Sequence, residues 1–329
     1  MGRNRARRVW GAALVALTLA PAAALSQSKF PERPLRLVVP FAPGGANDII
    51  GRRYAQDLTR FIGQNVIVDN RGGASGSIGS AEVARAKPDG HTLVIANTST
   101  HVINQVAMAN LPYDALKDFA PIAVIAVQPT GIAVHPSLPV KSLKGLVAFI
   151  KANPGKLSYG SAGTGSITNL TGELFKQLGG GLDIVHVPYK GAGPGLSDLV
   201  AGHIAVYTPT ISPAPLSYHK SGRIRVLAVN AEKRIQAAPD VPTAVEAGLP
   251  GMVVYAFNAI LTTAGSPKAA IDQLYQATLK VTADAEFQKF LRQAGAEPVT
   301  DSSPEKTTRF LESEIKRWTP MIQKMGLKK

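Results

Sequence analysis

Two glycine-rich turns contain the residues of this sequence that are best suited to bind an anion. The first turn, at 40–48, precedes apolar residues at helical spacing from Ile49 to Phe61. The second, at 160–166, precedes a helical pattern that begins at Ile167. Glycine lets backbone N–H groups approach a ligand closely, and a helix N-terminus carries partial positive charge. Each turn is therefore suited to a carboxylate or phosphate, although an ordinary connection between a strand and a helix has the same pattern.

The separation of the two turns bears on how they work together. They lie more than one hundred residues apart, so we expect them in different lobes of the protein. Two helix N-termini that face each other across a cleft would hold a small carboxylate or phosphate between them.

Residues with catalytic chemistry do not form a recognisable motif. The chain has no cysteine, no Gly-x-Ser-x-Gly elbow, no phosphate-binding Gly-Lys-Ser/Thr loop and no His-Glu-x-x-His pair. Its six histidines are dispersed, and only His101, at the end of a polar loop after a strand, is a candidate to line a ligand site. Asp48 is expected to support the first helix N-terminus, and Lys190 either pairs with an anion or is only solvated. Tyr189 and Phe41 are cleft walls or packing residues. We expect no catalytic residue, metal site or cofactor.

Strand and helix patterns alternate along most of the chain. This alternation is typical of mostly parallel sheets with helices on both faces, which bind ligands beyond the carboxyl ends of their strands. The loops at 41–48 and 97–101 both have that position and should lie side by side. Nearly continuous strand patterns at 122–134 indicate a crossing into a second lobe, and a strand at 253–261 indicates the return. The expected division is 27–128 and 253–329 for the first lobe and 129–252 for the second.

The first residues have the pattern of a signal peptide at 1–26. Four arginines precede an apolar core at 9–19, and Ala24-Leu25-Ser26 is a plausible cleavage site. The alternative is a retained anchor, for which the apolar run is short. Arg7-Arg8 hints at twin-arginine export, whereas the surrounding residues favour the general secretory route. The absence of cysteine excludes a lipid anchor and disulfides, and an exported chain without cysteine is typical of a bacterial periplasm.

The net charge of +14 narrows the possible partners. Lysine and arginine are scattered, and no basic stripe with interleaved aromatic residues is present, which argues against nucleic acid. A positive field instead steers small anions toward a cleft, or it is simply a solvated basic surface.

Short motifs along most of the chain resemble those of the tripartite tricarboxylate transporter substrate-binding proteins, the Bug receptors. They occur in order and at compatible spacing from about residue 30 to the C-terminus. The motifs are Val38 to Gly45 with Asp48, Asp69-Asn70-Arg71 with Gly73, Pro88-Asp89-Gly90, Leu111 to Asp114 with Lys117 to Pro121, Tyr159 to Ser166, His186 to Gly191, and Pro239 to Thr243 with Glu246-Ala247-Gly248.

This resemblance implies a two-lobed α/β fold like that of type II periplasmic binding proteins, the Venus-flytrap architecture, in which each lobe is a mostly parallel sheet flanked by helices. It also implies a monomeric periplasmic receptor that delivers a small organic carboxylate to inner-membrane transporter subunits. In the first lobe the implied ligand-binding residues are Phe41, Pro43, Gly44, Gly45, Ala46, Asn47, Asp48, Thr98, Ser99, Thr100, His101 and Phe257. In the second lobe they are Ser161, Gly163, Thr164, Gly165, Ser166, Tyr189, Lys190, Gly191, Pro209 and Thr210.

Two departures from the family pattern bear on the ligand. Many relatives have an Asp-Asn pair where this chain has Pro209-Thr210, and a tryptophan where it has Phe257. The missing aspartate favours an aromatic or aliphatic carboxylate with few amino groups. The alternatives to a transport receptor are a carboxylate sensor that signals to a partner protein and an enzyme on the same fold.

Overall fold

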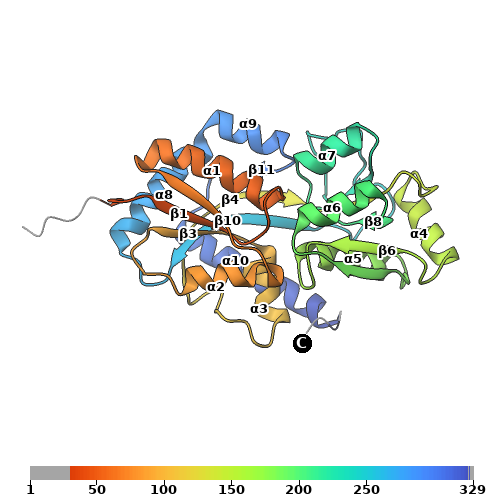
Figure 1. Cartoon of the computed structure of the whole chain (residues 1–329), viewed down its shortest axis with the longest axis horizontal. Coiled ribbons are helices and arrows are strands. Elements are labelled where there is room, and N and C mark those ends of the chain that lie inside the picture. The colour runs from red at the N-terminus through yellow and green to blue at the C-terminus, as the bar shows by residue number, and fades with distance from the viewer. Residues whose placement is uncertain (1–29, 325, 327–329) are drawn as a thin grey trace, which may run out of the picture.

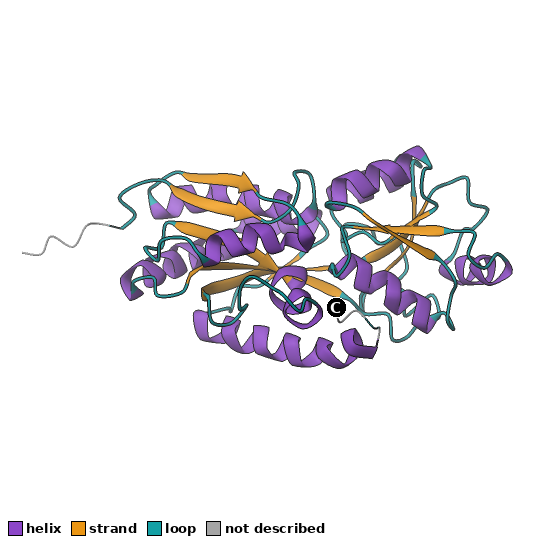
Figure 2. Ribbon diagram, turned by 60° about the horizontal axis from the view of Figure 1, so that its bottom comes forward, coloured by secondary structure: helices purple, strands orange, loops and turns teal. Residues whose placement is uncertain are grey.

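The structure is a computed structural model that describes residues 30–324 and residue 326. The expected signal peptide at 1–26 lies outside the described residues. The described chain forms two lobes, each built around its own β-sheet with helices packed on it (Figure 1 and Figure 2). None of the described helices is long and apolar enough to cross a membrane.

The first lobe contains both ends of the described chain. Its strands are β1 (Leu35–Val39), β2 (Val66–Asn70), β3 (Thr92–Asn97), β4 (Phe119–Pro129), β10 (Tyr255–Thr263) and β11 (Glu297–Pro298). Its helices are α1 (Ala46–Ile62), η1 (Ala74–Gly76), α2 (Ser77–Ala84), η2 (Ser99–Ile103), α3 (Asn104–Ala107), α8 (Lys268–Ala283), α9 (Ala285–Gln293) and α10 (Pro304–Lys324).

The second lobe is formed by the middle of the chain. Its strands are β5 (Gly131–Val134), β6 (Ser158–Ser161), β7 (Val185–Pro188), β8 (Val206–Tyr207) and β9 (Arg225–Val229). Its helices are α4 (Leu143–Ala152), α5 (Ile167–Leu178), α6 (Ala192–Ala201) and α7 (Pro213–Lys220).

Strand β1 and helix α1 show how the sequence determines these elements. Four of the five residues of β1 are buried, as expected for an apolar strand that pairs with parallel strands on both sides. Helix α1 buries Ile50, Tyr54 and Leu58, which share one face because they are four residues apart. It ends at Gly63, whose φ of 77° is accessible to glycine at little cost. The first glycine-rich turn is therefore held between a buried strand and a packed helix.

The two sheets have the same topology. The strand order is β2-β1-β3-β10-β4-β11 in the first lobe and β7-β6-β8-β5-β9 in the second. In each sheet four strands run in one direction, and the strand that enters from the other lobe, β10 or β5, runs against them. The short strand β11 also pairs antiparallel, with β4. The expected mostly parallel sheets are present, and apart from β11 the reversed strands are those that begin at the junction between the lobes.

The chain passes between the lobes at Thr130 and again at Val254, and the two crossings are hydrogen-bonded to each other. The N–H of Thr130 donates to the carbonyl of Val254 at 2.9 Å. Asn230 joins both crossings, because its N–H donates to the carbonyl of Thr130 at 2.8 Å and its carbonyl accepts from the N–H of Val254 at 2.9 Å. The two crossings are therefore tied together at one place, the hinge of this two-lobed architecture.

Helix α7 is an element that local sequence patterns do not reveal, because two prolines lie at its start. Pro213 and Pro215 usually argue against a helix. Here they lie in the first turn of α7, where backbone N–H groups have no intrahelical acceptor, so a proline removes no hydrogen bond of the helix.

Candidate functional site

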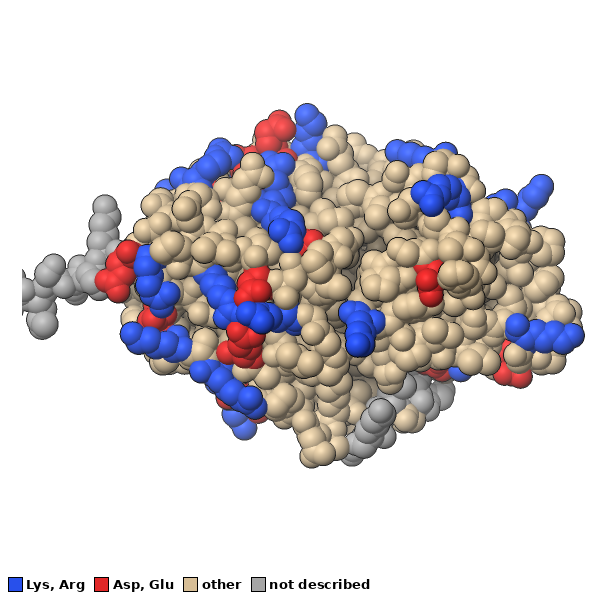
Figure 3. Space-filling view, viewed as in Figure 1, with Lys and Arg blue, Asp and Glu red and all other residues tan. Residues whose placement is uncertain are grey.

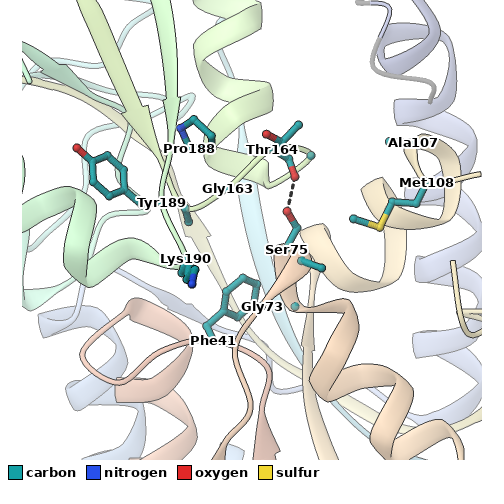
Figure 4. Close-up of a pocket in the computed structure, with 14 residues that line it drawn as sticks. Phe41, Gly73, Ser75, Ala107, Met108, Gly163, Thr164, Pro188, Tyr189 and Lys190 are labelled. Carbon is teal, nitrogen blue, oxygen red and sulfur yellow. Dashed lines mark hydrogen bonds between the residues drawn. The ribbon is translucent and has the colours of Figure 1, made fainter. Parts of the chain in front are cut away.

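The cleft between the lobes contains two neighbouring cavities, which share Phe41 and Ala162 in their walls. The inner cavity has a volume of about 50 Å³. It is lined by Phe41, Gly45, Ala46, Asn47, Asn97, Ser99, Ala162, Ser166, Ile167, Thr168, Ala192 and Thr210. The outer cavity has a volume of about 380 Å³. It is lined by Phe41, the loop 73–76, Ala107, Met108, the turn 162–165, Pro188, Tyr189 and Lys190 (Figure 4). The cavities together form one candidate binding region between the lobes.

The N-terminus of α1 faces the inner cavity with free backbone donors. Its N-cap, Gly45, has no side chain to cap the helix, and Ala46 and Asn47 follow it in the cavity wall. The first N–H groups of an α-helix have no intrahelical acceptor, and those of Ala46 and Asn47 make no hydrogen bond to any described residue. These N–H groups and the helix dipole favour an anion at this position.

Asp48 fixes the shape of this turn. Its carboxylate accepts from the N–H of Gly44 at 2.9 Å, from Nδ2 of Asn70 at 2.8 Å and from Nε of Arg52. Burial raises the pKa of Asp48, but the hydrogen bonds from Arg52, Gly44 and Asn70 outweigh burial and hold the pKa below its ordinary value. The side chain is therefore a charged support behind the turn, as the sequence indicated, and it lines neither cavity.

The second glycine-rich turn differs from the first, because neighbouring side chains already accept hydrogen bonds from three of its N–H groups and from one in the first turn of α5. The pairs are Ala162 N to Thr168 Oγ1 at 2.8 Å, Gly163 N to Ser161 Oγ at 3.2 Å, Gly165 N to Asn169 Oδ1 at 3.0 Å and Asn169 N to Ser166 Oγ at 3.1 Å. A ligand would have to displace these partners to use the same donors. The two helix N-termini are therefore not equivalent, and α1 presents the more open anion site.

Two hydrogen bonds join the lobes directly across the cleft. The hydroxyl of Ser75 donates to the carbonyl of Thr164 (Figure 4), and the N–H of Ile167 donates to Oγ of Ser99 at 2.9 Å. Ser75 reaches across from a stretch of backbone with positive φ, in which Ala74 and Ser75 have φ of 44° and 53°. Non-glycine residues rarely adopt such angles, and they concentrate at functional sites. The lobes are in contact, so this is a closed arrangement of the cleft.

Comparison with known proteins agrees with this two-lobed site. Residues 50–327 match the model of the tripartite tricarboxylate transporter family receptor. The chain belongs to this receptor family. The resemblance seen in the sequence motifs is thereby confirmed.

Three solved structures are similar to this receptor over most of its length. The periplasmic binding protein BugD is 30% identical, with a TM-score of 0.87 over 91% of this chain and 99% of the other. A protein of R. palustris solved with adipate is 35% identical, with a TM-score of 0.86 over 90% and 98% of the two chains. MatC from Rhodopseudomonas palustris, with bound malate, is 30% identical, with a TM-score of 0.84 over 89% and 100%. The expected two-lobed α/β fold is that of these solute-binding proteins.

The structure separates the residues implied by the family resemblance into two groups. Those that line a cavity are Phe41, Gly45, Ala46, Asn47, Ser99, Gly163, Thr164, Gly165, Ser166, Tyr189, Lys190 and Thr210. Those that line neither cavity are Pro43, Gly44, Asp48, Thr98, Thr100, His101, Ser161, Gly191, Pro209 and Phe257.

His101 is the clearest correction. Its side chain is fully buried in the first lobe, against the rings of Phe119 at 4.5 Å and Tyr113 at 5.9 Å, with Nδ1 2.9 Å from Oγ1 of Thr100. Burial lowers the pKa of His101 to about 3, so the imidazole is neutral at physiological pH. The sequence predicted His101 at the ligand site because it ends a polar loop after a strand. In the structure its side chain lies in the apolar core instead.

Other members of the second group have structural roles. Oγ1 of Thr98 accepts from the N–H of Phe257 at 3.2 Å, and the Phe257 ring packs on Phe310 with ring centroids 5.1 Å apart, beside a different cavity. The carbonyl of Pro209 accepts from the N–H of Gly131 at 2.8 Å, next to the hinge. These residues position the lobes and the sheet.

Several cavity-lining residues were missed by the sequence analysis. Asn97 lines the inner cavity, and its Oδ1 accepts from the N–H of Thr100 at 3.1 Å, which leaves its Nδ2 as a donor without a described partner. Met108 and the loop 73–76 line the outer cavity. The glycines around Ser75 were the available signal, but positive φ at a serine is not visible in a sequence.

The contact between Ser161 and His186 bears on a possible enzymatic activity. Oγ of Ser161 lies 2.7 Å from Nε2 of His186, a pairing typical of activated serine nucleophiles. However, Ser161 is fully buried and lines neither cavity, and Tyr159 stacks on His186 with centroids 4.9 Å apart. The pair therefore stabilises the second turn and offers no nucleophile to the cleft.

Charge in the binding region is sparse. Lys190 is the one charged residue among those that line the two described cavities, and it is exposed. Figure 3 shows mostly uncharged surface along the junction of the lobes, with charged side chains more frequent on the first lobe. The hydroxyl of Tyr189 donates to Asp198 at 2.7 Å and is held in the wall of the second lobe. The unpaired N–H groups at the start of α1 and Lys190 are therefore the candidate attractions for an anion among the residues that line these cavities.

Proposed function

We propose that this receptor binds a small organic carboxylate between its two lobes and delivers it to a tripartite tricarboxylate-type membrane transporter. The observation that carries the proposal is the uncapped N-terminus of α1 in the wall of the inner cavity. Backbone N–H groups fixed by a packed helix recognise a carboxylate without a charged side chain and need little reorganisation to do so.

The shapes of the cavities support an elongated ligand. Ligand pockets commonly have volumes of roughly 300–1,000 Å³, a range that includes the outer cavity but not the inner one. A carboxylate group fits the inner cavity, while the remainder of the molecule extends past Phe41 and Ala162 into the outer cavity. Two similar receptors were solved with adipate and malate, which supports the same chemical class here.

Delivery to a transporter is supported by the family and by the closed cleft. A receptor that closes around its ligand presents a surface that exists only in the loaded form, which a membrane carrier can recognise. We propose that the protein is exported by its N-terminal segment 1–26, that the mature chain begins near Gln27, and that it acts as a monomer in the periplasm. Mass spectrometry of the periplasmic fraction checks this, and an intact Met1 form in the membrane fraction would contradict it.

A carboxylate sensor for a signalling partner would have the same ligand site. The two functions separate in the cell: deletion of the receptor should abolish uptake of the radiolabelled carboxylate if it serves transport, and only the transcriptional response if it serves sensing. An enzyme is the weaker alternative, because the Ser161–His186 pair lies outside the cavities.

A proline substitution tests the proposed carboxylate site directly. Ala46→Pro removes a free N–H of α1 and places the proline ring where a carboxylate would lie. Proline is favoured at the first helical position, and the preceding Gly45 has φ −79° and ψ 166°, angles compatible with a following proline. Loss of a hydrogen bond to a charged group should weaken carboxylate binding about 10- to 100-fold in isothermal titration.

Ala285→Pro is the matched control, because Ala285 is the first residue of α9, follows Asp284 with ψ 124° and lines neither cavity. It should leave binding unchanged. Equal affinity of the Ala46→Pro variant and the wild type for every carboxylate that binds would exclude the start of α1 as the anion site.

A further inference from the structure

A groove with basic walls, called here the basic groove, lies between the two lobes. In the first lobe its wall is the end of α9, and in the second lobe it is the end of α7 together with the loop after β9 (Figure 1). Its volume is about 520 Å³, and none of its residues lines the inner or the outer cavity. Its lining residues are Lys220, Gln236, Ala237, Lys289, Arg292 and Gln293.

The two lobes pack against each other close to the basic groove. Gly295 lies two residues beyond Gln293, and a Cβ added to it would lie 2.7 Å from Cγ2 of Ile211 in the second lobe. Ile211 is fully buried, and its carbonyl accepts from Nε2 of Gln128 in the first lobe at 3.0 Å. The separation of the two walls of the groove is therefore tied to the relative position of the lobes.

The cations of the basic groove have few acidic partners. Among the described residues neither Lys220 nor Arg292 forms an ion pair. Lys289 lies 3.9 Å from Glu286, but both side chains are well exposed, so this pair contributes little. Asp240 lies 3.8 Å from Nε2 of the histidine that precedes Lys220 and does not line the groove. Three cations and no acidic residue therefore face the groove.

Helix stability explains each of two cations separately. Lys220 lies in the last turn of α7 and Arg292 in the last turn of α9, where a positive charge stabilises the helix dipole. Lys151 and Lys280 occupy the same position in α4 and α8, and they line none of the described cavities. The dipole therefore does not explain why the ends of two helices from different lobes face one groove.

The lining of the basic groove favours an acidic peptide over a small metabolite. Pockets for small molecules are mostly apolar, whereas Ala237 is the one apolar residue in this described lining. Guanidinium and ammonium groups form charge-assisted hydrogen bonds with carboxylates. The amides of Gln236 and Gln293 can both donate to and accept from peptide groups. Side-chain carboxylates on an extended peptide match both kinds of lining residue.

We propose that the basic groove docks an acidic segment of the membrane transporter that receives the ligand. This proposal rests on the proposed delivery of the ligand to such a transporter. A partner seated in the groove contacts both lobes at once, so its binding depends on how the lobes are arranged. An anionic membrane surface is the competing partner, but no aromatic or large apolar side chain lines the groove to enter the lipid.

Photo-cross-linking in the native bacterium tests the proposal without knowledge of the ligand. A photoreactive phenylalanine analogue replaces Gln236 or Gln293 in the full-length receptor, one position in each wall of the groove. The same analogue replaces Lys151 or Lys280 as the control positions. The groove positions should cross-link to a transporter subunit, and mass spectrometry should map the cross-link to a segment rich in aspartate and glutamate.

Charge reversal then tests the role of the cations. The double variant Lys220→Glu/Arg292→Glu should lower the cross-linking yield about ten-fold or more, because like charges that face each other across an interface are costly. Lys151→Glu/Lys280→Glu is the matched control, with the same change in net charge at the same helix positions. It should retain the yield. Lysines in place of the acidic residues of the mapped segment should restore cross-linking to the groove variant.

The remaining outcomes separate this proposal from the proposed function. A transporter cross-link from the control positions alone would overturn the groove as the docking site and leave delivery to a transporter intact. An equal loss of yield in both double variants would also overturn it, because net charge or folding would then be responsible. Cross-links from the groove to phospholipid alone would replace the transporter segment by the membrane. Absence of any cross-link would overturn the docking site, while the uptake measurement still decides delivery.

Discussion

Alanine substitutions at three glycines around the cleft separate two effects, backbone strain and available space. Gly45 has an ordinary φ of −79°, and an added Cβ would meet Ala192 at 3.6 Å, a normal contact. Gly165 has φ 73° but an open surrounding, with the nearest atom 3.9 Å away. Gly163 has φ 130°, and an added Cβ would lie 3.1 Å from the carbonyl oxygen of Tyr189 and 3.3 Å from Oγ of Ser75.

The expected destabilisation follows this order. At Gly45 the lower entropy of the unfolded chain offsets the poorer N-cap, so the free energy of unfolding should change by less than about 0.5 kcal/mol. Gly165→Ala should cost about 1–2 kcal/mol, because a Cβ disfavours positive φ. Gly163→Ala adds crowding against a backbone carbonyl and should cost roughly 2–4 kcal/mol in total.

Thermal unfolding measures the series, at roughly 2–4 °C of Tm for each kcal/mol in a protein of this size class. Ligand titration on the same variants adds a second test. The contact of the new Cβ with Ser75 arises across the cleft, so Gly163→Ala should weaken ligand binding more than its Gly165 counterpart does. Equal melting temperatures for the three variants, or the greatest loss at Gly45, would refute this account of the second turn.

Three further outcomes are expected. Ser99→Ala removes the acceptor of the Ile167 N–H across the cleft and should disfavour closure by about 1 kcal/mol. Ligand binding should then be weaker, and small-angle scattering at limiting ligand should give a larger radius of gyration than for the wild type. Unchanged values of both would show that the contact does not stabilise closure. Lys190→Ala should weaken carboxylate binding by no more than about five-fold, because an exposed charge contributes little, and abolished binding would instead indicate an essential ion pair. Burial lowers the pKa of His101 to about 3, against 6.5 in the unfolded chain. Between these two pH values the unfolded state binds one more proton than the folded state. The free energy of unfolding therefore decreases as the pH falls through this range, by up to about 1.4 kcal/mol per pH unit. His101→Gln should flatten the acid side of the stability profile measured by denaturant titration, and equal acid slopes for both proteins would contradict the assignment.

Much of the architecture was predictable because it depends on patterns that are local in the sequence. The apolar strand before residue 40 and the helical spacing after Gly45 determine where the first turn lies, and the same reasoning located the second turn before Ile167. The ordered motifs identified the family, which in turn implied two lobes closing on a ligand. Helix α7 is not apparent in the sequence, because Pro213 and Pro215 disfavour a helix everywhere except in its first turn.

The choice of functional atoms within those turns was decided only by the tertiary structure. The sequence presents the two turns as equivalent, but Thr168 and Asn169 cap the second while α1 stays open, and this depends on which side chains fold back. His101 turns into the core because Tyr113 and Phe119 surround it. Asn47 in the wall of the inner cavity donates from Nδ2 to Oδ1 of Asn258 at 2.9 Å, a partner 211 residues further along the chain.

These differences have one physical reason. Periodicity and turn composition report free energies that depend on neighbours in the chain, so they determine the positions of strands, helices and turns. Hydrogen-bond satisfaction and burial depend on neighbours in space, which the packing of the lobes brings together. The sequence by itself therefore determined that this protein has two glycine-rich turns before helices, and only the folded structure decided which of their N–H groups have no partner among the described residues.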